Sequence, residues 1–75
     1  MANRIFPITT SSIRLDQFLK WANIAATGGQ AKVFIRQGLV KVNGRVETRR
    51  SHLLKPGDEV EIQGARYKVS RHSAD

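Results

Sequence analysis

Positively charged side chains supply the chemistry that this sequence offers. Lys32 and Arg36 lie four residues apart, so they share one face of any helix that contains them. Helix formation does not require two like charges at this spacing, and an anion outside the helix would explain them. Thr27-Gly28-Gly29 comes just before, where the backbone N–H groups of a starting helix could bind a phosphate. The two glycines could equally serve only to close a turn between helices.

The distribution of charge also indicates an anionic partner. The chain has 75 residues with 13 Lys and Arg against 6 Asp and Glu, a formal net charge of +7. Residues 14–50 hold eight cations against two acids, which gives +6, whereas residues 51–75 hold four of each sign. A basic excess confined to one part of the chain favours a polyanion such as nucleic acid. A solvated basic surface without a partner is the plainer alternative.

The residues that catalysis or metal binding would need do not form a recognisable pattern. His52 and His72 are the only histidines, cysteine is absent, and the spacing matches neither a metal site nor a general base. The glycines match neither a dinucleotide fingerprint nor a P-loop. We therefore expect no enzymatic activity, no cofactor and no metal. With no apolar run long enough for a membrane helix and no signal-peptide core, we expect a cytoplasmic, monomeric protein.

The first of two predicted helices follows from apolar spacing. Apolar residues at i, i+3, i+4 and i+7 predict a helix over residues 13–23 with Ser12 as its cap and an inward face of Leu15, Phe18, Leu19 and Ala22. Asp16 lies in the first turn, where its charge suits the positive end of the helix dipole. Trp21 lies off the centre of the inward face, and we expect it to be in the core rather than partly exposed.

The second helix and a hairpin follow from local signals. Thr27 and Gln30 fit a capping box, and Gly38 fits the left-handed residue that commonly ends a helix. Asn43-Gly44 is a strong signal for a tight hairpin between residues 39–42 and 46–48. Its alternation predicts inward positions for Val40, Val42 and Val46.

Short strands complete a predicted α+β fold, in which the two packed helices precede a small, mostly antiparallel β-sheet. Residues 5–8 are predicted to be an edge strand, since Pro7 cannot donate a hydrogen bond to a sheet ladder. The remaining segments are predicted to be a turn over residues 53–58 with Pro56-Gly57 at its corner, strands over 59–62 and 66–69, and a frayed end over 70–75. Residues 1–75 are expected to form one domain with a core over about 5–69.

Several motifs, in order along residues 13–62, resemble one known family. They are Arg14-Leu15-Asp16 with Leu19, Gln30-Ala31-Lys32, Ile35 with Gly38, Val40 and Val42-Asn43-Gly44, and Leu54-Lys55 with Gly57-Asp58. The chain resembles the RNA-binding domain named after small-subunit ribosomal protein S-four, also called the alpha-L motif, and in particular its short stand-alone bacterial members, the YbcJ-like group. The resemblance implies a non-catalytic protein that binds structured RNA, such as ribosomal or transfer RNA, with a possible role in ribosome assembly or translation.

The same resemblance implies a set of RNA-binding residues. By position, the family's binding motif falls on Arg14, Gln30, Lys32, Arg36, Lys41 and Asn43, and charge adds Lys20, Arg45, Arg49 and Arg50. Many members have Ser-Arg-Ser before the second helix, whereas this chain has Thr27-Gly28-Gly29, so the arginine expected at position 28 is missing. A winged helix-turn-helix regulator that binds DNA and a protein adaptor with a basic face remain alternatives.

Overall fold

A five-stranded sheet and a short two-stranded ladder make up the β-structure. The computed structural model describes residues 3–8 and 10–71. In chain order the elements are β1 (Asn3–Ile8), β2 (Ile13–Arg14), α1 (Leu15–Trp21), α2 (Gly28–Arg36), β3 (Val40–Val42), β4 (Arg45–Val46), β5 (Leu53–Leu54), β6 (Glu59–Ile62) and β7 (Ala65–Arg71). The sheet has the order β1-β7-β6-β3-β4, with only β1 and β7 parallel, and β2 pairs with β5. The predicted α+β fold with a mostly antiparallel sheet is confirmed.

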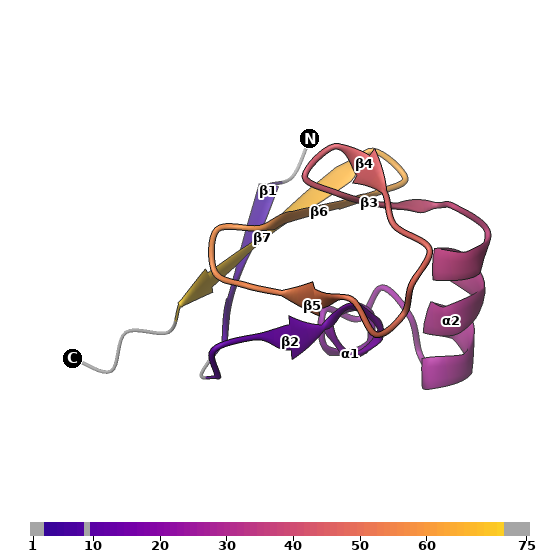
Figure 1. The fold of residues 1–75 in the computed structure, drawn as a ribbon, viewed down its shortest axis with the longest axis horizontal. Helices are drawn as coiled ribbons and strands as arrows, with labels where there is room; N and C mark the ends of the chain where they lie inside the picture. The colour runs from indigo at the N-terminus through magenta and orange to yellow at the C-terminus, as the bar shows by residue number, and fades with distance from the viewer. Residues whose placement is uncertain (1–2, 9, 72–75) are drawn as a thin grey trace.

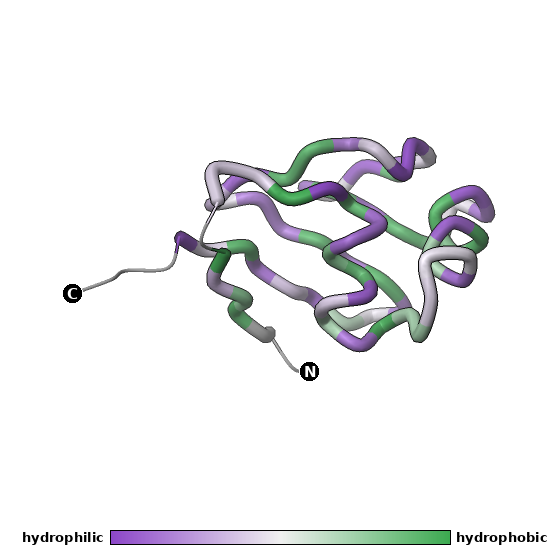
Figure 2. The backbone as a smooth tube through the Cα atoms, turned by 90° about the horizontal axis from the view of Figure 1, so that it is seen from below, coloured by the Kyte–Doolittle hydropathy of each residue, from purple (hydrophilic) through white to green (hydrophobic). Residues whose placement is uncertain are grey.

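The core lies between the large sheet and the layer that contains the helices and the β2–β5 ladder (Figure 1). Hydrophobic and hydrophilic residues are interleaved along the chain (Figure 2), so both layers can turn apolar side chains toward each other. The largest fully buried side chains are Phe18, Leu15, Leu19, Ile35, Leu54, Val40, Val60 and Val69. The predicted inward face of the first helix is therefore confirmed.

Helix α1 is shorter than predicted because tertiary hydrogen bonds define its start. Ile13–Arg14 form β2, in which Ile13 lies opposite Leu54, so the helix begins at Leu15. Its first N–H groups donate to backbone carbonyls, Leu15 to His52 at 2.8 Å and Asp16 to Arg50 at 3.2 Å. The prediction of Ser12 as the cap was wrong, since these carbonyls take the place of a side-chain cap.

The end of α1 was also predicted too late in the chain. The helix ends at Trp21, and Asn23 has a φ of 61°, a left-handed conformation in which asparagine is tolerated. The N–H groups of Ile24 and Ala25 both donate to the Leu19 carbonyl at 3.0 Å. The chain therefore turns toward α2 within a few residues.

Helix α2 begins and ends where its sequence predicts. The Gln30 N–H donates to the Thr27 hydroxyl at 3.1 Å, and the Gln30 side-chain oxygen accepts from the Ala26 N–H at 2.6 Å. The Gln30 side chain thus accepts from the backbone N–H of Ala26, the residue before the cap, rather than from the N–H of Thr27. Gly38 has a φ of +75°, as expected of the residue that ends the helix.

The strands contain several further corrections. The hairpin at Asn43-Gly44 and the edge position of β1 are confirmed, but Val46 is 54% exposed and does not face the core. Leu53–Leu54 form β5 instead of part of a turn, because β2 provides a pairing partner. Strand β7 continues to Arg71, so the prediction of a frayed end was wrong for residues 70 and 71. Residues 72–75 lie outside those described.

Trp21 is not in the core. Its side chain is 47% exposed and packs edge-on against Phe6, with the ring centroids 5.1 Å apart. The indole covers an aromatic cluster instead of lying inside it. Among residues 3–8 and 10–71, neither helix is long and apolar enough to cross a membrane.

Candidate nucleic-acid interface

Residues 47–52 connect β4 to β5 and are held in place by backbone hydrogen bonds. The Glu47 N–H donates to the Val40 carbonyl at 3.0 Å, and the His52 N–H donates to the Arg49 carbonyl at 3.2 Å. The carbonyls of Arg50 and His52 accept the two N–H groups at the start of α1 described above. This connection is therefore fixed to both layers of the fold before any ligand binds.

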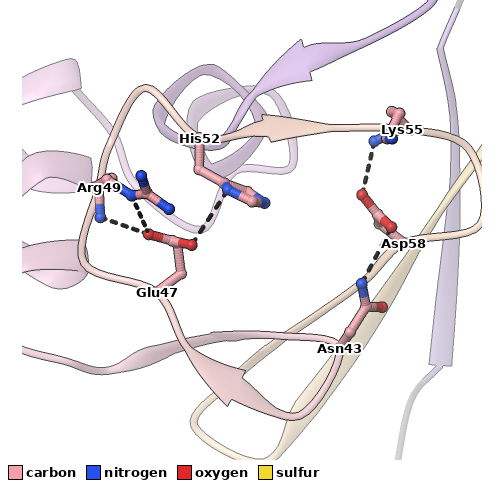
Figure 3. Close-up of polar contacts among 6 residues, drawn as sticks. All are labelled: Asn43, Glu47, Arg49, His52, Lys55 and Asp58. Carbon is pink, nitrogen blue, oxygen red and sulfur yellow. Dashed lines mark hydrogen bonds and ion pairs between the residues drawn. The ribbon is translucent and has the colours of Figure 1, made fainter.

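The Glu47 carboxylate organises the side chains of this connection (Figure 3). One oxygen accepts from the Arg49 backbone N–H at 3.0 Å and from Arg49 Nε at 3.3 Å, and the other lies 3.2 Å from His52 Nδ1. The Arg49 backbone N–H is the main cause that lowers the pKa of Glu47, with burial opposing it. The Glu47 side chain is only 15% exposed, so its carboxylate interacts with Arg49 and His52 more than with solvent.

Four cations from two separate elements surround one open cavity of about 290 Å³. We call this cavity the basic groove; it is lined by Lys32 and Arg36 of α2 and by Thr48, Arg49, Arg50 and Ser51 of the connection. None of these lining residues is acidic. Four like charges around one cavity repel one another, and an anion in the groove would relieve that repulsion.

The packing of α2 explains why its two cations face the groove. Ala31 and Ile35 are fully buried, and Lys32 and Arg36 each follow one of them on the helix. Lys32 is half-buried and Arg36 is exposed, so the lysine stem lies against the protein while the ammonium can reach solvent. Lys32 and Arg36 line the same cavity, as expected for residues on one face of a helix, and the structure adds Arg49 and Arg50 beside them.

The other predicted residues of the helical region lie outside the basic groove. The Arg14 guanidinium donates to the Asp16 carboxylate at 2.8 Å, which offsets part of its charge. Gln30 uses its side-chain oxygen to cap α2. Lys20 lies beside Gly28, where an added Cβ would be 4.0 Å from Lys20 Cδ. A Cβ at that distance would make an ordinary van der Waals contact, so the Lys20 stem does not by itself require a glycine at position 28.

The three predicted hairpin residues are also separate from the groove. Lys41 lies between buried Val40 and Val42, so its side chain is on the opposite face of the sheet, in register with Glu61. The Asn43 side chain donates to Asp58 at 3.1 Å and accepts from the Glu59 N–H at 3.0 Å, so it is used in holding β6 to the hairpin. Arg45 is exposed in β4.

Sequence reasoning missed the hydroxyl and histidine residues around the cations. Thr48 and Ser51 flank Arg49 and Arg50 in the groove, and His52 contacts Glu47. The run Thr48-Arg49-Arg50-Ser51 contained the signal, since hydroxyls beside arginines are common phosphate donors. Within residues 3–8 and 10–71, no group of three or more His, Asp or Glu is placed to hold a metal ion.

A family model described as the S4 domain matches residues 6–70, nearly the whole described chain. The chain belongs to the S4 domain family. Within this family, a probable ribosome maturation protein, RlbA of Bacillus subtilis, is 47% identical over 64 residues, which cover 85% of this chain and 89% of that protein. Small ribosomal subunit protein uS4 of Anaeromyxobacter sp. is 38% identical over 64 residues, which cover 31% of its length.

Two solved structures are similar to this chain in fold. The solution structure of YbcJ from E. coli, described as revealing an alfaL motif involved in RNA-binding, is 33% identical with a TM-score of 0.66, covering 93% of this chain and 87% of that one. A crystal structure of a pseudouridylate synthase is 36% identical with a TM-score of 0.64, covering 69% of this chain but 22% of the synthase. The chain thus spans most of RlbA and YbcJ and only a minor part of uS4 and the synthase.

Proposed function

We propose that this S4 domain protein binds structured RNA without catalysing a reaction on it, and that its basic groove grips the phosphate backbone. One observation carries the proposal: Lys32 and Arg36 of α2 meet Arg49 and Arg50 around one cavity whose lining contains no acid. Lysine and arginine neutralise phosphates, and the hydroxyls of Thr48 and Ser51 can donate to phosphate oxygens. The groove thus offers a donor set suited to a polyanion.

RNA recognised by shape and backbone fits this donor set better than base readout does. The groove is lined by cations and hydroxyls, without an aromatic residue for base stacking and without an asparagine or glutamine that would read adenine. Structured RNA is largely recognised through phosphates and sugar hydroxyls, which require cations and hydroxyl groups. The relatives named for ribosome maturation and for the small ribosomal subunit support ribosomal RNA as the target and ribosome assembly as the setting.

Titration of a fluorescently labelled RNA stem-loop at several salt concentrations tests this proposal. The Lys32→Ala, Arg36→Ala double variant should bind more weakly and lower the slope of log K against log salt by roughly 1.4–1.8, because each neutralised phosphate contributes about 0.7–0.9. The matched control is Arg66→Ala, Lys68→Ala, which removes two cations from β7 in register with Glu61 and Glu59. Equal slopes for the two double variants would reject the groove as the binding surface.

Competition at matched salt separates RNA from the alternatives. Duplex DNA that displaces the RNA stem-loop at lower concentration than unlabelled RNA does would favour a DNA-binding regulator. A ribosome-associated partner that copurifies with the chain after ribonuclease treatment, and that is lost in the double variant, would favour a protein adaptor.

A further inference from the structure

A second depression shares Arg49 with the basic groove and has the composition of an anion site. Its volume is about 620 Å³, and it is lined by Ser11, Ser12, Arg49, Ser51, His52, Leu53 and Lys55. Three hydroxyls and three nitrogen bases or cations are thus gathered from the β1–β2 loop, the 47–52 connection and β5 with its following residue. No lining residue is acidic, so phosphate oxygens would meet donors from three segments.

The depression adjoins the basic groove through shared walls. Arg49 and Ser51 line both cavities, which places one guanidinium and one hydroxyl at their junction. The Glu47 carboxylate holds Arg49 on one side and His52 on the other (Figure 3). The Glu47 carboxylate at this junction therefore already has Arg49 and His52 as partners.

Lys55 is the cation that the depression adds to those of the groove. The Asp58 carboxylate accepts the Lys55 backbone N–H at 2.9 Å and the Asn43 side-chain amide at 3.1 Å (Figure 3). Within residues 3–8 and 10–71, no ion pair engages the Lys55 ammonium at its tip. Its charge is available to a ligand, while its backbone fixes the turn that follows β5.

We infer that the phosphodiester backbone of the bound RNA continues from the basic groove past Arg49 into this depression, where Lys55, His52 and the serine hydroxyls contact further phosphates of the same molecule. This inference rests on the proposed function and extends its binding surface to the β2–β5 side of the fold. Lys55 then contacts phosphates at one end of the bound stretch of RNA, and Lys32 and Arg36 contact phosphates at the other end.

Ethylation interference on a labelled RNA stem-loop tests this path, because it maps the phosphates whose modification blocks binding. Wild-type protein should show one run of sensitive phosphates. Lys55→Ala should lose sensitivity at one end of the run and Lys32→Ala at the other. Each variant should also lower the salt slope by about 0.7–0.9. The matched control Lys68→Ala removes an exposed cation of β7 and should keep the whole run.

The outcomes separate this inference from the proposed function. If Lys55→Ala keeps the wild-type run of phosphates and the wild-type salt slope, while Lys32→Ala shortens the run and lowers the slope, the path into the depression is wrong. The basic groove then remains the RNA-binding surface. If neither variant differs from Lys68→Ala, the proposed function itself fails. Circular dichroism of each variant shows whether the fold is retained, and Ser12→Ala supplies a second, uncharged test that should weaken binding without changing the salt slope.

Discussion

Replacing Glu47 by alanine should destabilise the fold more than replacing any solvated acid of the outer sheet face. The carboxylate accepts two hydrogen bonds from Arg49 and lies 3.2 Å from His52 Nδ1. Losing a hydrogen bond to a charged group costs about 1.5–3 kcal/mol. Because the Arg49 side chain is 77% exposed and can be solvated again, we expect a total near 1–2 kcal/mol rather than the sum of the contacts.

The expected loss is large enough to measure by thermal unfolding. In a domain of this size, 1 kcal/mol lowers Tm by about 4–8 °C, so Glu47→Ala should melt roughly 4–16 °C below wild type. Trp21 is the only tryptophan and packs against Phe6, so its fluorescence reports on the fold. Glu61→Ala is the control, since Glu61 lies on the outer face in register with Lys41 and Arg66. Equal melting temperatures for the two variants would refute the role assigned to Glu47.

Acid should abolish the contribution of Glu47 in a defined pH range. Its pKa is lowered from 4.5 in the folded state, mainly by the Arg49 backbone N–H, so the folded state binds this proton less readily than the unfolded chain. The stabilisation is therefore fully present above about pH 4.5 and is lost as the pH falls through the lower folded pKa. The Tm difference between wild type and Glu47→Gln should narrow as the pH falls below about 4.5, and a constant difference would contradict this sign.

Three further substitutions test other parts of the structure. Thr27→Ala removes the hydroxyl that caps α2 and should cost about 1 kcal/mol in thermal unfolding, whereas Thr27→Ser should restore stability. Asn43→Ala removes two side-chain hydrogen bonds at a φ of 52° and should lower Tm while leaving RNA affinity at fixed salt unchanged; weaker binding by the folded variant would show direct contact with the RNA. Lys41→Ala should change RNA affinity less than Lys32→Ala, and the reverse order in the same titration would move the binding surface to the sheet.

The parts of the fold that depend on neighbouring residues could be predicted from the sequence. The cap at Thr27, the left-handed Gly38 and the Asn43-Gly44 turn each arise from backbone preferences within a few residues. The start of α1 could not be predicted in this way, because β2 forms only when Leu53–Leu54 provides a partner and because distant carbonyls cap the helix. Local spacing carries no information on such long-range pairing.

The candidate site also has a part that local sequence predicts and a part that depends on long-range contacts. The shared face of Lys32 and Arg36 follows from helical spacing, and the dipeptide Arg49-Arg50 is visible as charge. Their meeting around one groove depends on the path of the 47–52 connection, which Glu47 and the start of α1 determine. Alternation along the strand predicted that Lys41 faces outward. That this outward face lies away from the groove depends on the long-range arrangement.

Chemical-shift mapping of the isotopically labelled protein during titration with an RNA stem-loop tests the central claim most directly. If the basic groove grips RNA, the largest changes in backbone amide shifts should fall on Lys32, Arg36 and residues 48–51, and they should fade as salt is raised. The outer sheet face, with Lys41 and Lys68, should change least. Largest changes on that face, with the groove unaffected, would contradict the account.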